Sequence, residues 1–164
     1  MNPSRRKVRA IHEAAHAVGC EFNGWPVKRV LLREERTVVA GVPSSTNGFT
    51  EALHPKPSIE FLGLLVGVAL SGYGALRRID LDRAEMEHHA KNTGLDWQTI
   101  EGYFEELHVE PGYKLAAIYD GVAVAEDILN NNPKAIERIS EVLVQTSEIN
   151  GDDVRRIIKE EQSN

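Results

Sequence analysis

The chain has 164 residues, of which 41% are hydrophobic and 27% are charged, and its formal net charge is −6. This composition is typical of a globular protein, so we expect residues 1–164 to form a single domain with one hydrophobic core. Because phosphate binding needs a concentrated cationic surface, an acidic chain of this kind is not expected to bind nucleic acid.

The sequence also predicts a location. Its one cysteine, Cys20, excludes an internal disulfide, and its first residues lack the apolar core of a signal peptide. The most apolar run, residues 61–72, is shorter than the ~20 residues needed to cross a bilayer. We therefore expect a cytoplasmic protein that has no membrane partner and buries this run as a helix.

The first predicted helix spans about residues 4–22. Ser4 is a suitable N-cap, and Asn23 with Gly24 is a typical end. Between them, apolar residues recur at alternating spacings of three and four, which predicts one face packed against a core. These apolar positions are Val8, Ile11, Ala15, Val18 and Phe22.

Segments rich in β-branched and apolar residues follow, and they predict a small sheet. The expected strands are residues 27–32, 37–42 and 49–54. The charged residues 33–36 suit a hairpin loop between the first two strands. The third strand ends at the prolines after His54 and is a candidate for a sheet edge.

Helical patterns fill the rest of the chain. The first begins at Pro57 or Ser58 and is expected to break at Gly72 and Gly74. The later helices are expected at residues 81–93, 96–107, 114–129 and 133–146, with Asp96 capping the second of these and Asp152 capping a last helix. The predicted fold is α+β and predominantly helical, with the first helix packed on a small β-sheet and a helical bundle following.

The first helix carries the motif His12-Glu13-Ala-Ala-His16. Residues four apart lie one turn apart on the same face, so both imidazoles can bind one metal ion. Glu13 projects to the side, where a zinc-bound water would lie, and suits a general base. We therefore predict a zinc (Zn²⁺) hydrolase site, with His12 and His16 as ligands and Glu13 as the catalytic residue.

A catalytic zinc site needs a third protein ligand from elsewhere in the chain. Metzincins place a histidine six residues after the second histidine, but Phe22 occupies that position, which excludes this class. Residues 79–89 are rich in candidate ligands, and their pattern alone does not choose among them. The candidates are Asp80, Asp82, Glu85, Glu87, His88 and His89.

Residues 10–18, Ala-Ile-His-Glu-Ala-Ala-His-Ala-Val, resemble the His-Glu-Ala-Gly-His-Ala stretch of FtsH-type ATP-dependent zinc peptidases. In that family the third ligand is an aspartate at the start of a helix, followed by a Leu-like residue and, four positions on, an alanine. Residues 80–84, Asp-Leu-Asp-Arg-Ala, are similar. The resemblance therefore implies Asp80 as the third ligand, with Asp82 or a nearby glutamate as its rival.

Two further stretches carry the resemblance. Gly48, Phe49 and Thr50 resemble the Gly-x-Thr strand of the family, which lies along the active site and accepts an extended substrate. Residues 141–154 are similar to the family's closing Leu-rich helix and the turn after it. The resemblance covers most of the chain and implies a peptidase domain alone, because the membrane anchor and the AAA+ ATPase phosphate loop are missing.

The resemblance implies a zinc-dependent metalloendopeptidase that hydrolyses peptide bonds in flexible or unfolded polypeptides. Without its own ATPase, it would need a separate ATPase partner to unfold a substrate. The Gly-rich, Ala-Ala-Glu segment that precedes the aspartate in the family is not recognisable in residues 66–78. This departure motivates the alternative of a catalytically inactive peptidase-fold binding or regulatory module. A monomer, a dimer and a hexamer all stay open.

Overall fold

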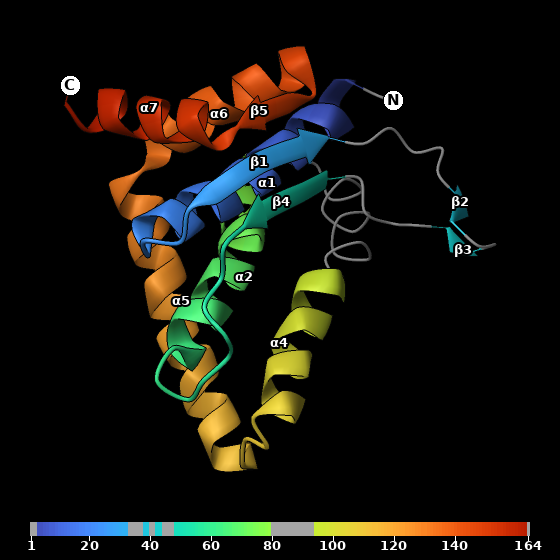
Figure 1. The fold of residues 1–164 in the computed structure, drawn as a ribbon, viewed down its shortest axis with the longest axis vertical. Coiled ribbons are helices and arrows are strands. Elements are labelled where there is room, and N and C mark those ends of the chain that lie inside the picture. Colours follow the sequence, from blue (N-terminus) through green and yellow to red (C-terminus); the bar gives the residue numbers. More distant parts are fainter. Residues whose placement is uncertain (1–2, 33–37, 40–41, 44–47, 80–93, 164) are drawn as a thin grey trace.

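A computed structural model describes residues 3–32, 38–39, 42–43, 48–79 and 94–163 (Figure 1). The predicted α+β, mostly helical fold is confirmed. The strands are β1 (Val27–Leu32), β2 (Val38–Val39), β3 (Val42–Pro43), β4 (Gly48–Ala52) and β5 (Glu148–Asn150). The helices are α1 (Pro3–Phe22), α2 (Leu62–Leu76), α4 (Gly94–Glu106), α5 (Pro111–Asn131), α6 (Pro133–Thr146) and α7 (Gly151–Gln162).

Strand β1 is the centre of a three-stranded antiparallel sheet with the order β4-β1-β5. Its Val30 pairs with Thr50 of β4 on one side and with Ile149 of β5 on the other. The prediction that β1 forms a hairpin with residues 37–42 is wrong, because both edges of β1 are already occupied. Strands β2 and β3 pair with each other instead. Strand β4 lies at an edge of this sheet, as predicted.

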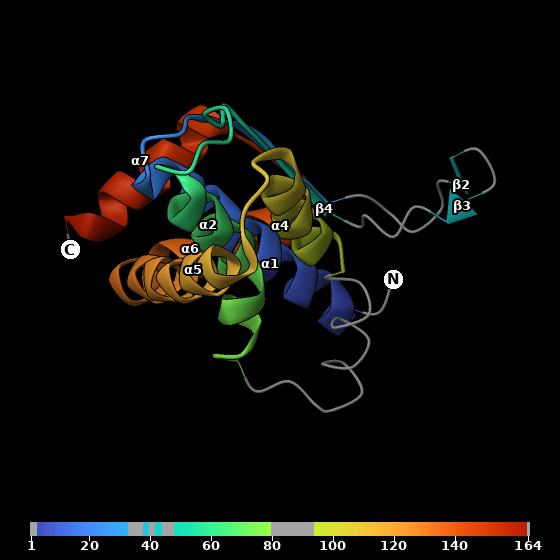
Figure 2. The ribbon, with the colours of Figure 1, turned by 90° about the horizontal axis from the view of Figure 1, so that it is seen from below.

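Helix α1 is the central element of the core. It contacts β1 and β4 on its sheet side, and α2 and α6 on its helical side (Figure 2). Its alanines and Val18 are fully buried, and their small side chains allow neighbouring elements to approach closely. The helix ends at Phe22, as predicted, and Gly24 beyond it has a φ of 73°, a left-handed conformation that glycine adopts without strain.

Helix α2 begins and ends later than predicted, and it continues through Gly72 and Gly74 to Leu76. These glycines serve close packing rather than a turn. A Cβ atom at Gly74 would lie 2.8 Å from Leu129 Cδ1, and one at Gly72 would lie 2.6 Å from His16 Nε2. The predicted break is therefore wrong, because tertiary contact explains both residues without any change of backbone direction.

A second cluster of buried residues joins α2, α4 and α5. Leu62 and Val66 of α2 pack there with Ile100 and Phe104 of α4 and with Ala117 of α5. This packing holds α4 against α2 and so brings the first turn of α4 near α1. The helices predicted at residues 96–107, 114–129 and 133–146 are confirmed with small differences at their ends, whereas the one at 81–93 lies outside the described residues.

The C-terminal segment differs from the prediction in two details. Strand β5 was not predicted, and the cap of α7 is Asn150, whose side chain accepts a hydrogen bond from the Asp153 backbone N–H at 2.9 Å. Asp152 instead lies inside the first turn of α7. Within the described part of the chain, no helix is both long enough and apolar enough to cross a bilayer.

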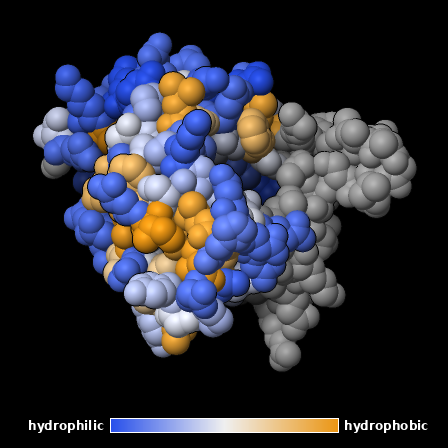
Figure 3. Space-filling model, turned by 60° about the horizontal axis from the view of Figure 1, so that its bottom comes forward, coloured by the Kyte–Doolittle hydropathy of each residue, from blue (hydrophilic) through white to orange (hydrophobic). Residues whose placement is uncertain are grey.

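Large apolar side chains also reach the surface. Figure 3 shows a patch of hydrophobic residues between hydrophilic ones on one face of the molecule. Among the described residues, the most exposed large apolar side chains are Leu53, Ile59, Tyr113, Leu115 and Tyr119. None of the five belongs to the candidate site described next.

Candidate metal centre

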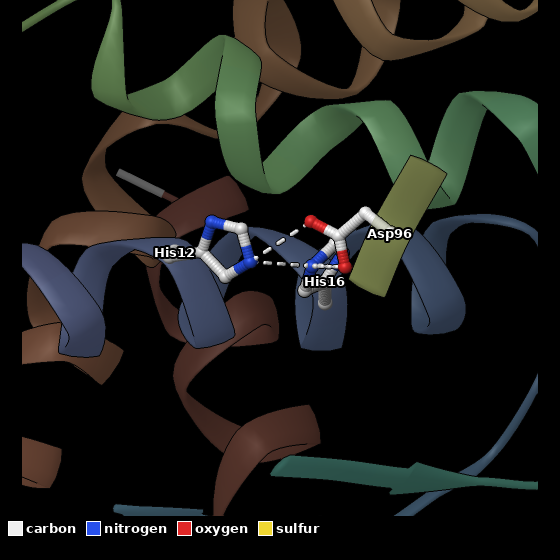
Figure 4. Close-up of side chains that lie close together, drawn as sticks. All are labelled: His12, His16 and Asp96. Atoms are coloured by element: carbon white, nitrogen blue, oxygen red, sulfur yellow. Dashed lines mark hydrogen bonds and ion pairs between the residues drawn. The ribbon is translucent and has the colours of Figure 1, made fainter. Parts of the chain in front are cut away.

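Three side chains from two helices converge beside α2 (Figure 4). His12 and His16 extend from successive turns of α1, and their Nε2 atoms are 3.0 Å apart. Asp96, in the first turn of α4, places Oδ2 3.2 Å from His12 Nε2 and Oδ1 3.5 Å from His16 Nε2. One ligand atom from each residue lies within 4.8 Å of the other two.

These distances fit a metal centre. With zinc–ligand distances of about 2.0–2.1 Å and tetrahedral angles, two ligand atoms lie about 3.3 Å apart. The two Nε2 atoms are 3.0 Å apart, and each lies 3.2 or 3.5 Å from a different Asp96 oxygen, which is close to that value. Oδ2 of Asp96 is also buried, and its polar neighbour is His12 Nε2, so this carboxylate needs positive charge from a protonated histidine or from a bound cation.

Helix α2 fixes the orientation of His16. The ring atom Nδ1 of His16 lies 2.8 Å from the carbonyl oxygen of Val68, which only accepts hydrogen bonds. Nδ1 therefore carries a proton and donates it to Val68, and Nε2 faces His12 and Asp96. Such a hydrogen bond to the second ring nitrogen is the usual support of a metal-binding histidine.

The same helix provides the space for both rings at Gly72. A Cβ atom there would lie 2.6 Å from His16 Nε2, 2.7 Å from His12 Cε1 and 2.8 Å from His12 Nδ1. Any side chain at this position would overlap the imidazoles. His12 Nδ1 is buried in this contact and has no partner among the described residues.

The electrostatics of the centre favour positive charge. Burial lowers the pKa of His16, but the Asp96 carboxylate, Glu13 and the hydrogen bond to Val68 outweigh burial and raise this pKa to about 9. Burial raises the pKa of Asp96, but the two histidines outweigh it and hold this pKa well below its ordinary value. The two imidazoles and the Asp96 carboxylate together stabilise a proton, and a metal cation could take the place of that proton.

Glu13 lies on the side of α1 that faces the sheet. It is 8% exposed, and its Oε2 accepts a hydrogen bond of 2.9 Å from the hydroxyl of Thr50 in β4. A Cβ atom at Gly48 would overlap Oε1 of Glu13, so β4 passes directly over this carboxylate. The described structure thus brings the predicted base together with two residues of the predicted substrate strand, whereas Phe49 is 44% exposed.

The predicted third ligand, Asp80, lies outside the described residues, as do its rivals from Asp82 to His89. Asp96 was expected only as a helix cap, and the structure adds it to the candidate ligands. No sequence signal distinguishes its carboxylate from that of an N-cap, because the approach of α4 to α1 depends on packing between distant segments.

Two other titratable residues lie near this region without joining the three ligand atoms. The thiol of Cys20 is buried, and burial followed by the charge of Glu21 raises its pKa to about 12. His54 packs edge-on against Trp25, and burial followed by the charge of His16 lowers its pKa. Cys20 therefore stays a neutral, buried thiol, as predicted.

Comparison of the chain with models of known protein families finds no match, and comparison with curated proteins finds none either. The evidence on function is therefore the motif, its geometry and the environment of its side chains.

Proposed function

We propose that this chain is a zinc-dependent metalloendopeptidase. The observation that carries the proposal is the convergence of His12 Nε2, His16 Nε2 and the Asp96 carboxylate, within 4.8 Å, beside the glutamate of a His-Glu-x-x-His helix. His12 and His16 would hold the ion together with one carboxylate. Asp96 is the candidate among the described residues, and Asp80 is the candidate that the resemblance to FtsH-type peptidases implies.

Bound zinc would supply a Lewis acid that polarises the scissile carbonyl and lowers the pKa of water to about 7. The chain supplies the proton transfer. The carboxylate of Glu13 accepts a proton from the attacking water and returns one to the leaving amine, as general acid–base catalysis requires. The bond between His16 Nδ1 and Val68 keeps Nε2 free for the ion.

An extended polypeptide is the substrate that the surroundings of Glu13 support. Among the described residues, β4 pairs with β1 along one edge only, and a free strand edge can accept an extended chain by backbone hydrogen bonds. Thr50 of the same strand contacts Glu13. A peptide added to β4 would therefore run past the base. A cytoplasmic location and a separate ATPase partner for folded substrates belong to the same proposal.

The test uses the wild-type chain and Glu13→Gln, each loaded with zinc, and fluorescein-labelled casein as the unfolded substrate. We expect cleavage by the wild type, loss of cleavage with a chelator, and recovery when zinc is returned. Glu13→Gln should retain zinc by mass spectrometry and lose nearly all turnover. Wild-type turnover in Glu13→Gln would refute the proposal. Zinc binding without any cleavage by the wild type would instead support the inactive binding module.

A further inference from the structure

The side chain of Thr50 links strand β4 to helix α1 at the proposed base. The Thr50 hydroxyl lies 2.9 Å from Oε2 of Glu13 and 3.2 Å from the backbone carbonyl oxygen of the same residue. A hydroxyl has one hydrogen to donate, so it serves one acceptor at a time. The carboxylate oxygen is both nearer and charged, which makes it the stronger acceptor.

The alternation of β4 explains why this contact is specific. Side chains at positions 48 and 50 lie on one face of the strand, toward α1, and positions 49 and 51 lie on the other. Glu51 bonds to Arg29 at 2.9 Å on that other face. On the face toward α1, Gly48 leaves the space that Oε1 of Glu13 fills, and Thr50 provides the donor for Oε2.

We propose that Thr50 is a positioning residue that holds the Glu13 carboxylate in the orientation needed for proton transfer, with Gly48 providing the necessary clearance. This inference rests on the proposed peptidase function. Glutamate has three side-chain torsions, and a base that moves by about 1 Å loses up to about 100-fold in rate. Because β4 is also the proposed substrate edge, one strand would set both the substrate register and the direction of the base.

The main test compares Thr50→Val with Thr50→Ser in casein cleavage by zinc-loaded protein. Valine keeps the shape and removes the donor, so we expect kcat to fall about 10-fold to 100-fold with little change in KM. Serine keeps the hydroxyl and should restore kcat to within about threefold. Zinc content should stay unchanged in both. Thr146→Val is the matched control, because it removes a hydroxyl that donates to the Val142 and Glu148 carbonyls rather than to Glu13, and its kcat should be unchanged.

A second measurement needs neither activity nor metal. In chelator-treated protein, Thr50→Val should lower the urea unfolding midpoint more in a chain with Glu13 than in a chain with Glu13→Ala. In the Glu13→Ala chain the carboxylate that accepts from Thr50 is already missing. Gly48→Ala should also reduce kcat while zinc stays bound.

Several results would overturn the positioning role. They are wild-type kcat in Thr50→Val, no rescue by serine, loss of zinc in Thr50→Val, wild-type kcat in Gly48→Ala, or equal midpoint shifts in the two backgrounds. Wild-type turnover in Glu13→Gln is a different outcome, because it removes the proposed function itself.

Discussion

Gly72 is the residue at which α2 most directly controls the proposed metal centre. In Gly72→Ala the added Cβ atom would lie 2.6–2.8 Å from ring atoms of His12 and His16. Non-bonded atoms prefer about 3.5 Å or more, so the rings or the helix must move by roughly 0.7–0.9 Å. Metal–ligand distances tolerate only about 0.2 Å. We therefore expect zinc affinity to fall by at least the 10–100-fold that is typical of lost support around a ligand.

The same substitution has two opposing effects on the metal-free fold. Alanine is favoured over glycine inside a helix by about 1 kcal/mol, whereas overpacking costs about 1–3 kcal/mol. The expected net change in the free energy of unfolding is a loss of up to about 2 kcal/mol. Chelator competition measures the affinity for zinc, and urea unfolding in the presence of chelator measures the stability.

Gly102→Ala is the control for helix propensity alone. Gly102 is an exposed residue inside α4, and a Cβ atom there would meet nothing within 4 Å. It should stabilise the fold by about 0.5–1 kcal/mol and leave zinc affinity unchanged. If Gly72→Ala bound zinc as tightly as the wild type, the contact between α2 and the imidazoles would not constrain the metal centre, and the reasoning would be refuted.

Three further predictions concern the third ligand, the buried thiol and the last helix. Asp96→Asn should reduce zinc affinity by more than the roughly 100-fold expected of a supporting residue. If zinc content by mass spectrometry falls in Asp80→Asn and not in Asp96→Asn, Asp80 is the third ligand instead. The raised pKa of Cys20 contributes stability that is fully present below its ordinary value of 9.0 and lost as pH rises through about 12. The urea midpoint should therefore fall between these pH values in the wild type, and a Cys20→Ala chain with an equal fall would contradict this account. Asn150→Ala should lower the free energy of unfolding by about 1 kcal/mol in thermal or urea unfolding, because Asn150 caps α7. An equal or larger loss of stability in Asp152→Ala would show that Asp152 is the cap, as the sequence suggested.

The parts of the fold that local sequence specifies were predictable. The apolar spacing of residues 8–22 predicted α1, and the placement of His12 and His16 on one face followed from helix geometry alone. Pro133 marked the start of α6 for a similarly local reason, since proline is favoured in the first turn of a helix.

The errors occurred where distant contacts decide the structure. A glycine that breaks a helix and a glycine that makes room for a neighbour look the same in the sequence. At Gly72 and Gly74, only the positions of the imidazoles and of Leu129 show that the glycines make room for neighbours. Strand β5 is three residues long and forms because β1 presents an edge to it. Asp96 reaches the histidines because Ile100 and Phe104 pack α4 against α2.

The side chains of the proposed site are supported by separate elements of the fold. Helix α1 supplies the two imidazoles and the base, but other elements orient two of these side chains. His16 bonds to Val68 of α2, and Glu13 bonds to Thr50 of β4. A change in α2 should therefore alter metal affinity first, whereas a change in β4 should alter turnover while the metal stays bound. Measuring zinc content and turnover of Gly72→Ala and Thr50→Val side by side separates these two effects. An equal loss of zinc from both variants would show that α2 and β4 do not act independently on the side chains of α1.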